Sequence, residues 1–254
     1  MTELFIFWIA ALAGAIAVMP YQFKLLQGKM EEEKRLNPTK KVPSPPVLAI
    51  LSIIQSSVLL GIASLVGTKL APKVDLHWWL LDHWLYGSAV PYPILVTILL
   101  SIIFGVIVSI LIIGLDIGFM KRISKVEMEE PSKWQSFLAS FYGGISEEVL
   151  TRLFLMSLVV YALDLIGIGE FRYWIGIVVA ALLFGLGHLP AAFALLGKTK
   201  MIFFRTILLN TIPGILFGYL YWKFGIEIAM VAHFTGDIFL HVILGPIARK
   251  KLAH

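Results

Sequence analysis

Ionisable side chains occur inside apolar stretches of the second half of the chain, where each one needs a partner or a chemical role. The set consists of Glu147, Glu148, Arg152, His188, His233 and Asp237. Carboxylates and imidazoles can take a proton from water, and the same groups can bind a metal ion that makes its bound water acidic. Both routes lead to hydrolysis, in a place from which water is otherwise excluded.

The spacing separates the roles of the two neighbouring glutamates. Glu148 and Arg152 are four residues apart, so they share one face of a helix and can form an ion pair. Glu147 is rotated from Glu148 by about 100° around the helix axis and faces elsewhere. We therefore expect Glu148 and Arg152 to support the structure while Glu147 acts as a general base. The predicted catalytic residues are Glu147, His188, His233 and Asp237.

A metal-dependent version of this site is also open at the level of sequence. Zinc is usually held by three protein side chains in a hydrolytic site. His188 and His233 could supply two of them, and Glu147 or Asp237 the third. Without metal, the glutamate would activate water directly, and the sequence does not choose between these schemes.

The elements that carry these residues are predicted to be membrane helices. Of the 254 residues, 59% are hydrophobic and 15% are charged, whereas soluble proteins carry roughly 25% charged residues. The apolar runs are continuous rather than alternating, which excludes an outer-membrane barrel. The sequence predicts one all-α domain, a polytopic helical bundle over residues 1–254. Seven blocks approach or exceed the length needed to cross the bilayer: Leu4–Met19, Val47–Val66, Ile94–Leu115, Phe137–Leu163, Tyr173–Leu196, Met201–Trp222 and Ile226–Leu244.

Two segments leave the number of spans open. The fourth block, Phe137–Leu163, is long enough to tilt or to be broken. The segment Leu76–Tyr86 is rich in aromatic residues and carries His and Asp, which favours an interfacial position over an eighth span.

The distribution of cations predicts the orientation. Sixteen of the 21 Lys and Arg residues fall on one set of alternate loops and four on the other. The side with sixteen is expected to be cytoplasmic, which places the N-terminus outside and the C-terminus inside. These cations lie in loops between apolar blocks, where they would meet lipid headgroups. We therefore interpret the net charge of +5 as binding to the lipid bilayer and expect no nucleic acid as a partner. The expected location is an integral, multi-pass membrane protein, in the cell membrane if the source is prokaryotic.

In this orientation, the candidate residues fall in one layer on the cytoplasmic side. At ~1.5 Å per residue, Glu147, His188 and His233 lie about 12–17 Å from the cytoplasmic ends of three different helices. Asp237 lies one turn nearer to the cytoplasm than His233. Such a match of depths favours a shared site over scattered packing contacts.

Other interpretations of the same residues remain. They could be hydrogen bonds that hold a non-catalytic scaffold together, or a relay in a proton- or ion-coupled transporter. The chain has no Cys, no H-E-x-x-H, and no G-x-S-x-G around Ser146 or Ser157, which excludes several other proteolytic mechanisms. Asn210 is interpreted as a hydrogen bond between helices, and His241 is assigned no role.

Three short motifs resemble a known family. Residues 147–152 (EEVLTR) match E-E-x-x-x-R, residues 184–188 (FGLGH) match F-x-x-x-H, and residues 233–237 (HFTGD) match H-x-x-x-N/D. In this order on consecutive apolar helices, they resemble the CAAX protease and bacteriocin-processing (CPBP or Abi) family, which includes the type II CAAX prenyl endopeptidases. The resemblance covers about residues 134–245, the predicted catalytic core.

The resemblance implies an intramembrane endopeptidase. Glu147 would activate water together with His188, Arg152 would hold Glu148, and His233 with position 237 would polarise the scissile carbonyl. Asp237 stands where an Asn would suit this role better, because an ionised Asp cannot donate to an oxyanion. It would have to be protonated, bind a metal or orient His233. The implied substrate is a peptide or a prenylated protein cleaved near the cytoplasmic face, although other members are linked to bacteriocin immunity or peptide maturation. Members are described both as metalloproteases and as glutamate-based enzymes.

Overall fold

The computed structural model describes residues 1–37, 43–120 and 132–247, and all regular elements in these ranges are helical, which confirms the all-α class. The N-terminal part contains α1 (Thr2–Ala17), α2 (Met19–Leu36), α3 (Pro45–Leu70), the 3₁₀ turn η1 (Ala71–Val74), α4 (Trp79–Tyr86) and α5 (Ile94–Met120). The C-terminal part contains α6 (Lys133–Phe141), η2 (Tyr142–Glu147), η3 (Val149–Met156), α7 (Ser157–Leu165), α8 (Phe171–Leu196), α9 (Lys200–Phe224), α10 (Ile226–Asp237) and η4 (Ile238–Leu244).

Several helix ends follow local signals in the sequence. Two prolines directly after Ser44 open α3, where the missing amide protons cost nothing. Ser132 and Gln135 form a capping box at the start of α6. Gly87 ends α4 with a φ of 70°, a conformation that glycine adopts without strain.

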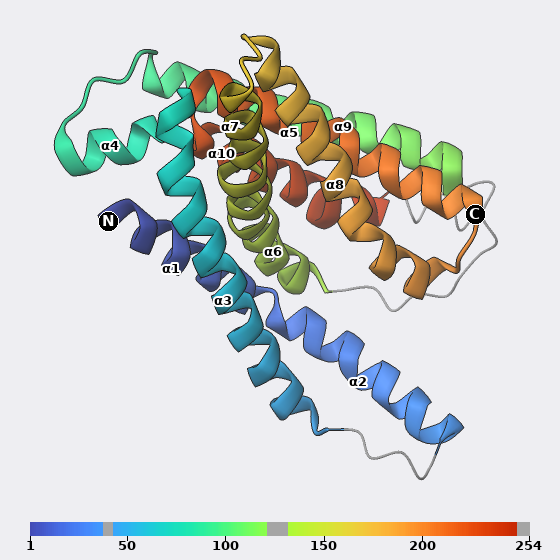
Figure 1. Ribbon diagram of the computed structural model, residues 1–254. Helices are drawn as coiled ribbons and strands as arrows, with labels where there is room; N and C mark the ends of the chain where they lie inside the picture. The colour runs from blue at the N-terminus through green and yellow to red at the C-terminus, as the bar shows by residue number, and fades with distance from the viewer. Residues whose placement is uncertain (38–42, 121–131, 248–254) are drawn as a thin grey trace.

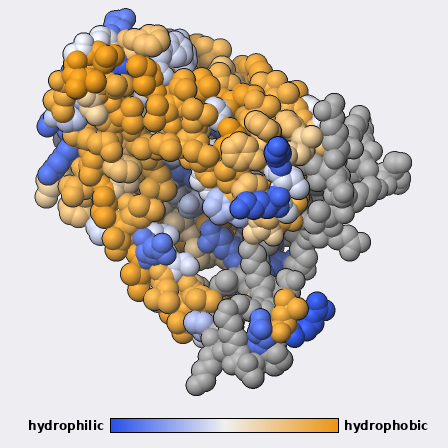
Figure 2. Space-filling model, turned by 45° about the vertical axis from the view of Figure 1, so that its right-hand side comes forward, coloured by the Kyte–Doolittle hydropathy of each residue, from blue (hydrophilic) through white to orange (hydrophobic). Residues whose placement is uncertain are grey.

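Six helical stretches within the described residues are long and apolar enough to cross a membrane, so the protein is a multi-pass integral membrane protein. They are Thr2–Lys24, Pro45–Val74, Ile94–Met120, Phe171–Leu196, Lys200–Phe224 and Ile226–Ile247. Large apolar side chains cover much of the outer surface of the bundle (Figure 2), as expected for a surface that contacts lipid rather than water. These stretches correspond to six of the seven predicted blocks.

The remaining block, Phe137–Leu163, is broken into four consecutive segments. α6 is followed by the π-helices η2 and η3 and then by α7. A π-helix is wider than an α-helix, is rare, and is often found at functional sites. The number of spans and the orientation stay predictions, and part of the cations that support the orientation lie outside the described residues: Lys40, Lys41, Lys121, Arg122, Lys125, Arg249, Lys250 and Lys251.

The aromatic segment around α4 packs against one end of the bundle. α4 has eight residues and is about 12 Å long, too short to cross a bilayer. The Glu227 side chain at the start of α10 accepts a hydrogen bond from the Leu81 backbone amide at 2.8 Å. The Tyr86 hydroxyl donates to Glu3 of α1. These contacts connect α4 to both halves of the chain.

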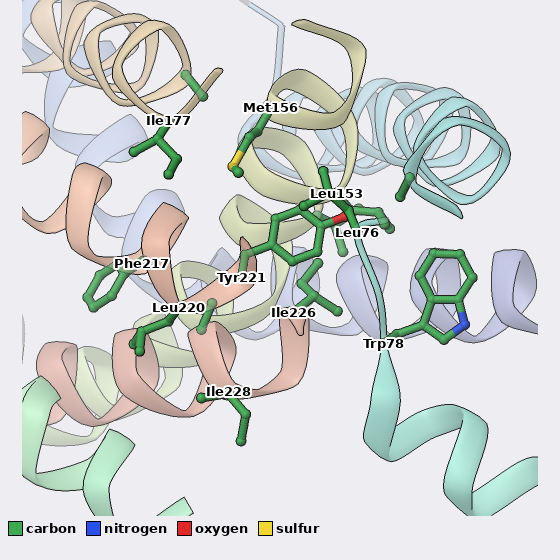
Figure 3. Close-up of a cluster of buried hydrophobic side chains, with 14 of the residues drawn as sticks. Leu76, Trp78, Leu153, Met156, Ile177, Phe217, Leu220, Tyr221, Ile226 and Ile228 are labelled. Atoms are coloured by element: carbon green, nitrogen blue, oxygen red, sulfur yellow. The ribbon is translucent and has the colours of Figure 1, made fainter. Parts of the chain in front are cut away.

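The helices pair in a way that brings distant parts of the sequence together. α8 packs along α9, α5 packs along α10, and α1 packs along α3. Figure 1 shows α2 and the first part of α3 extending away from this bundle. At the centre, buried side chains from α9 and α10 meet those of η3, α8 and the segment before α4 (Figure 3), with Tyr221, Leu153 and Leu76 among them. This packing fixes the helices on which the candidate residues lie.

Candidate active site

Glu147, the last residue of η2, lies between the two predicted histidines. Its Oε1 atom is 3.7 Å from Nε2 of His188 on α8, and its Oε2 atom is 3.8 Å from Nε2 of His233 on α10. Three helical elements that are far apart in the sequence therefore meet at one carboxylate. Both distances exceed that of a direct hydrogen bond, so each pair can accommodate a bridging water.

The hydrogen bond of Nδ1, the ring nitrogen that does not face Glu147, indicates which tautomer His188 adopts. Nδ1 lies 2.9 Å from the Phe184 carbonyl oxygen, which can only accept, so Nδ1–H donates. In the neutral ring, Nε2 then carries a lone pair that faces Glu147. The His188 side chain is 37% exposed, whereas that of His233 is 8% exposed, so His188 is the more accessible of the two rings.

His233 is held from behind by Glu148. Its Nδ1 lies 2.6 Å from Glu148 Oε1, and its ring stacks on Phe217 with centroids 4.6 Å apart. A buried carboxylate that accepts from one imidazole nitrogen fixes the ring and leaves the other nitrogen for chemistry. This contact was not predicted from the sequence. In the sequence, only the similar depth of Glu148 and His233 in the membrane pointed to a hydrogen bond between them.

Glu148 and Arg152 form the ion pair expected from their spacing, with Nη1 3.1 Å from Oε1 and both side chains almost fully buried. Arg152 Nη2 also donates to the Gly214 carbonyl oxygen at 3.1 Å. Its guanidinium lies over the rings of Phe184 and Phe217, 5.3 and 5.7 Å from their centroids. Arg152 therefore holds the carboxylate that in turn holds His233.

Asp237 ends α10 one helical turn after His233. Its Oδ1 atom lies 3.7 Å from His233 Nε2 and 4.0 Å from His241 Nε2. The structure thus places all four predicted catalytic residues in one cluster, because Glu147 faces both histidines and His233 faces Asp237. Asn210, which was expected to form a hydrogen bond between helices, donates instead to the Thr206 carbonyl oxygen of its own helix, at 2.8 Å.

Gly143 is a further site residue that the sequence reasoning missed. A methyl group on its Cα would overlap Asp237 Oδ2 and come within 3.2 Å of His233 Nε2. The next residue, Gly144, approaches Phe234 so closely that its own methyl would lie 2.7 Å from the Phe234 Cβ. The adjacent pair of glycines inside an apolar block, four residues before Glu147, was the signal that could have found it.

The sequence left open a zinc site formed by His188, His233 and either Glu147 or Asp237. Tetrahedral zinc needs its protein ligands about 2.0–2.2 Å from one point. Within residues 1–37, 43–120 and 132–247, no group of three or more His, Asp or Glu side chains is arranged to hold a metal ion. We therefore derive no step through a metal.

The fold and the site define a multi-pass membrane protein in which two histidines flank the Glu147 carboxylate. Residues 130–239, which include every residue of this cluster except His241, match the family model for Type II CAAX prenyl endopeptidase Rce1-like proteins. This part of the chain is a domain of that family, and the resemblance inferred from the three motifs is confirmed. No curated protein and no solved structure matches the chain.

Proposed function

We propose that the protein is an intramembrane endopeptidase in which Glu147 activates a water molecule for attack on a peptide carbonyl. The observation that carries this proposal is the position of the Glu147 carboxylate between two imidazole Nε2 atoms, at 3.7 and 3.8 Å. A water between Glu147 and His188 would meet two acceptors, a carboxylate oxygen and a lone pair. Both of its protons would then be directed at the protein, and its oxygen lone pairs at the substrate.

The reaction needs no reactant besides peptide and water. The water oxygen bonds to the carbonyl carbon while Glu147 takes one water proton. The C–N bond then breaks as Glu147 passes this proton to the departing amine nitrogen. The products are a new carboxyl group and a new amine, and Glu147 returns to its starting state.

His233 is proposed to stabilise the oxyanion that forms during attack. Glu148 accepts from its Nδ1–H, so a proton on Nε2 would make the ring a cation with a donor directed at the site. Asp237 lies 3.7 Å from that nitrogen and supplies negative charge that stabilises such a cation. This assigns Asp237 an electrostatic role, which an ionised carboxylate can perform although it cannot donate a hydrogen bond.

We further propose a prenylated C-terminal peptide as the substrate, cleaved near the cytoplasmic face. Two facts support this substrate: the family to which residues 130–239 belong and the position of the cluster on helices of a bundle whose outer surface is apolar. A substrate anchored in the bilayer by its own isoprenoid would bring its backbone to a membrane-embedded site.

The test measures peptide cleavage by the purified full-length protein in detergent micelles, followed by mass spectrometry of the products. A prenylated CAAX peptide should lose its last three residues, and the peptide without the isoprenoid should be a poorer substrate. Cleavage in micelles, which have no two compartments, is expected of an enzyme and not of a transporter. If neither peptide were cleaved, a protease of this specificity would be excluded.

Two matched variants test the role of Glu147. E147Q should fold and lose turnover, since an amide cannot take the water proton. E227Q makes the same change at another glutamate of the bundle, one that contacts α4 and not the site, and should retain activity. Wild-type cleavage by E147Q would remove the general base from the mechanism.

A further inference from the structure

The helix that carries His233 and Asp237 is fastened to α5, a helix outside the range that matches the family. Ser109 of α5 is 1% exposed, and its hydroxyl oxygen lies 2.7 Å from the Gly236 carbonyl oxygen of α10. It also lies 2.8 Å from the Gly105 carbonyl oxygen one turn earlier in its own helix. A carbonyl oxygen can only accept, so Ser109 is the donor, and its single proton is shared between the two carbonyl oxygens.

The two backbones approach closely at this point. A methyl group on Gly105 would overlap the Ala232 carbonyl oxygen and come within 3.0 Å of the Gly236 amide nitrogen. A methyl group on Gly236 would lie 3.7 Å from the Ser109 hydroxyl oxygen. α5 thus touches α10 beside both predicted catalytic positions, because Ala232 precedes His233 and Gly236 precedes Asp237.

This contact also marks the place where the helix changes its geometry. α10 ends at Asp237, and the π-helix η4 begins at the next residue. His233 and Asp237 both precede this change of winding, which alters the direction in which the residues after Asp237 project. A hydrogen bond to Gly236 restrains the rotation of the backbone between these two side chains.

From these contacts we propose that Ser109 is a positioning residue for the hydrolytic site. By donating to the Gly236 carbonyl oxygen, it fixes the rotation of α10 at which the His233 ring faces both Glu147 and Asp237. The expected effect of Ser109 on kcat rests on the proposed function, whereas its effect on the rotation of α10 does not. α5, which lies before the range that matches the family, would thus help to position the site residues of α10.

Ser101 provides a matched control on the same helix. It is also buried, 2% exposed, but its hydroxyl donates to the Ile98 carbonyl oxygen within α5. S101A and S109A therefore remove the same group from similar surroundings, and only S109A removes a bond to α10. We expect S109A to lower kcat about tenfold with little change in KM, since a small misplacement of catalytic groups slows the chemical step, and S101A to leave both unchanged.

A structural readout makes the test independent of activity. The chain has no cysteine, so spin labels can be placed on introduced cysteines at Leu100 of α5 and Ile243 of η4, both exposed. The distance distribution between the labels should shift or broaden in S109A and match the parent in S101A. If S109A did not fold, S109C, which keeps the volume and donates weakly, would be measured kinetically instead.

The outcomes separate this inference from the proposed function. Equal kcat for S109A and S101A, or a rise in KM alone, would overturn the positioning role, as would an unchanged distance distribution. If the parent protein cleaved nothing, the proposed function would fail, and the distance measurement alone would decide whether Ser109 fixes α10.

Discussion

Removing Arg152 should destabilise the protein far more than removing a better-exposed arginine. Arg152 and Glu148 form a buried i,i+4 pair whose side chains are 2% and 0% exposed. In the R152M variant, Glu148 would keep only the His233 ring as a polar partner within the described residues, and its Oε2 atom already has none. Breaking a buried pair from one side costs roughly 3–5 kcal/mol, or about two to four orders of magnitude in the unfolding constant.

Arg205 offers the control for this variant. Its Nε atom lies 2.6 Å from Asp116 Oδ1, closer than the Arg152 contact, but the two side chains are 19% and 31% exposed. A pair that is partly hydrated contributes about 0.2–1 kcal/mol, so R205M should cost much less despite the shorter distance. The assay is reversible unfolding of the purified variants in mixed micelles, with the free energy of unfolding compared with that of the parent.

A double variant tests whether the unpaired charge of Glu148 causes the loss of stability in R152M. E148Q in the R152M background removes the charge that would otherwise be buried alone, so it should recover a large part of the lost stability while activity stays low. If R152M cost no more than R205M, or if E148Q recovered nothing, the stability would not depend on neutralising Glu148. The assignment of this pair to structural support would then be wrong.

Three further predictions follow from the site and the sequence. G143A should lower kcat by at least tenfold because its methyl group would displace Asp237, whereas G114A, whose methyl group would meet nothing within 4 Å, should be neutral; equal activities would show that this close approach is not needed. Protein freed of metal, with metal content assayed on the same sample, should keep full activity, and a loss that zinc restores would refute the glutamate-based mechanism. Reporter fusions at Lys198–Lys200 and at the C-terminus should both report the cytoplasm, and opposite results would refute the span count between them.

The membrane class and the identity of the candidate residues could be predicted from the sequence because both depend on local properties. A run of about 20 apolar residues crosses a bilayer wherever the other helices lie. A four-residue spacing places Glu148 beside Arg152 on any helix. The long block Phe137–Leu163 was the least certain, since the sequence does not show whether it stays one α-helix or changes to π-helix around Glu147.

Contacts between helices were decided only by the tertiary structure. The bond from His233 to Glu148, the approach of Gly143 to Asp237 and the bond from Ser109 to Gly236 each join elements far apart in the sequence. Each depends on how two helices are rotated and shifted against one another, and this follows from the packing of the whole bundle. The types and spacing of the residues therefore predict which side chains could act in the proposed hydrolysis, while the packing sets which of their atoms face each other and which neighbours hold them there.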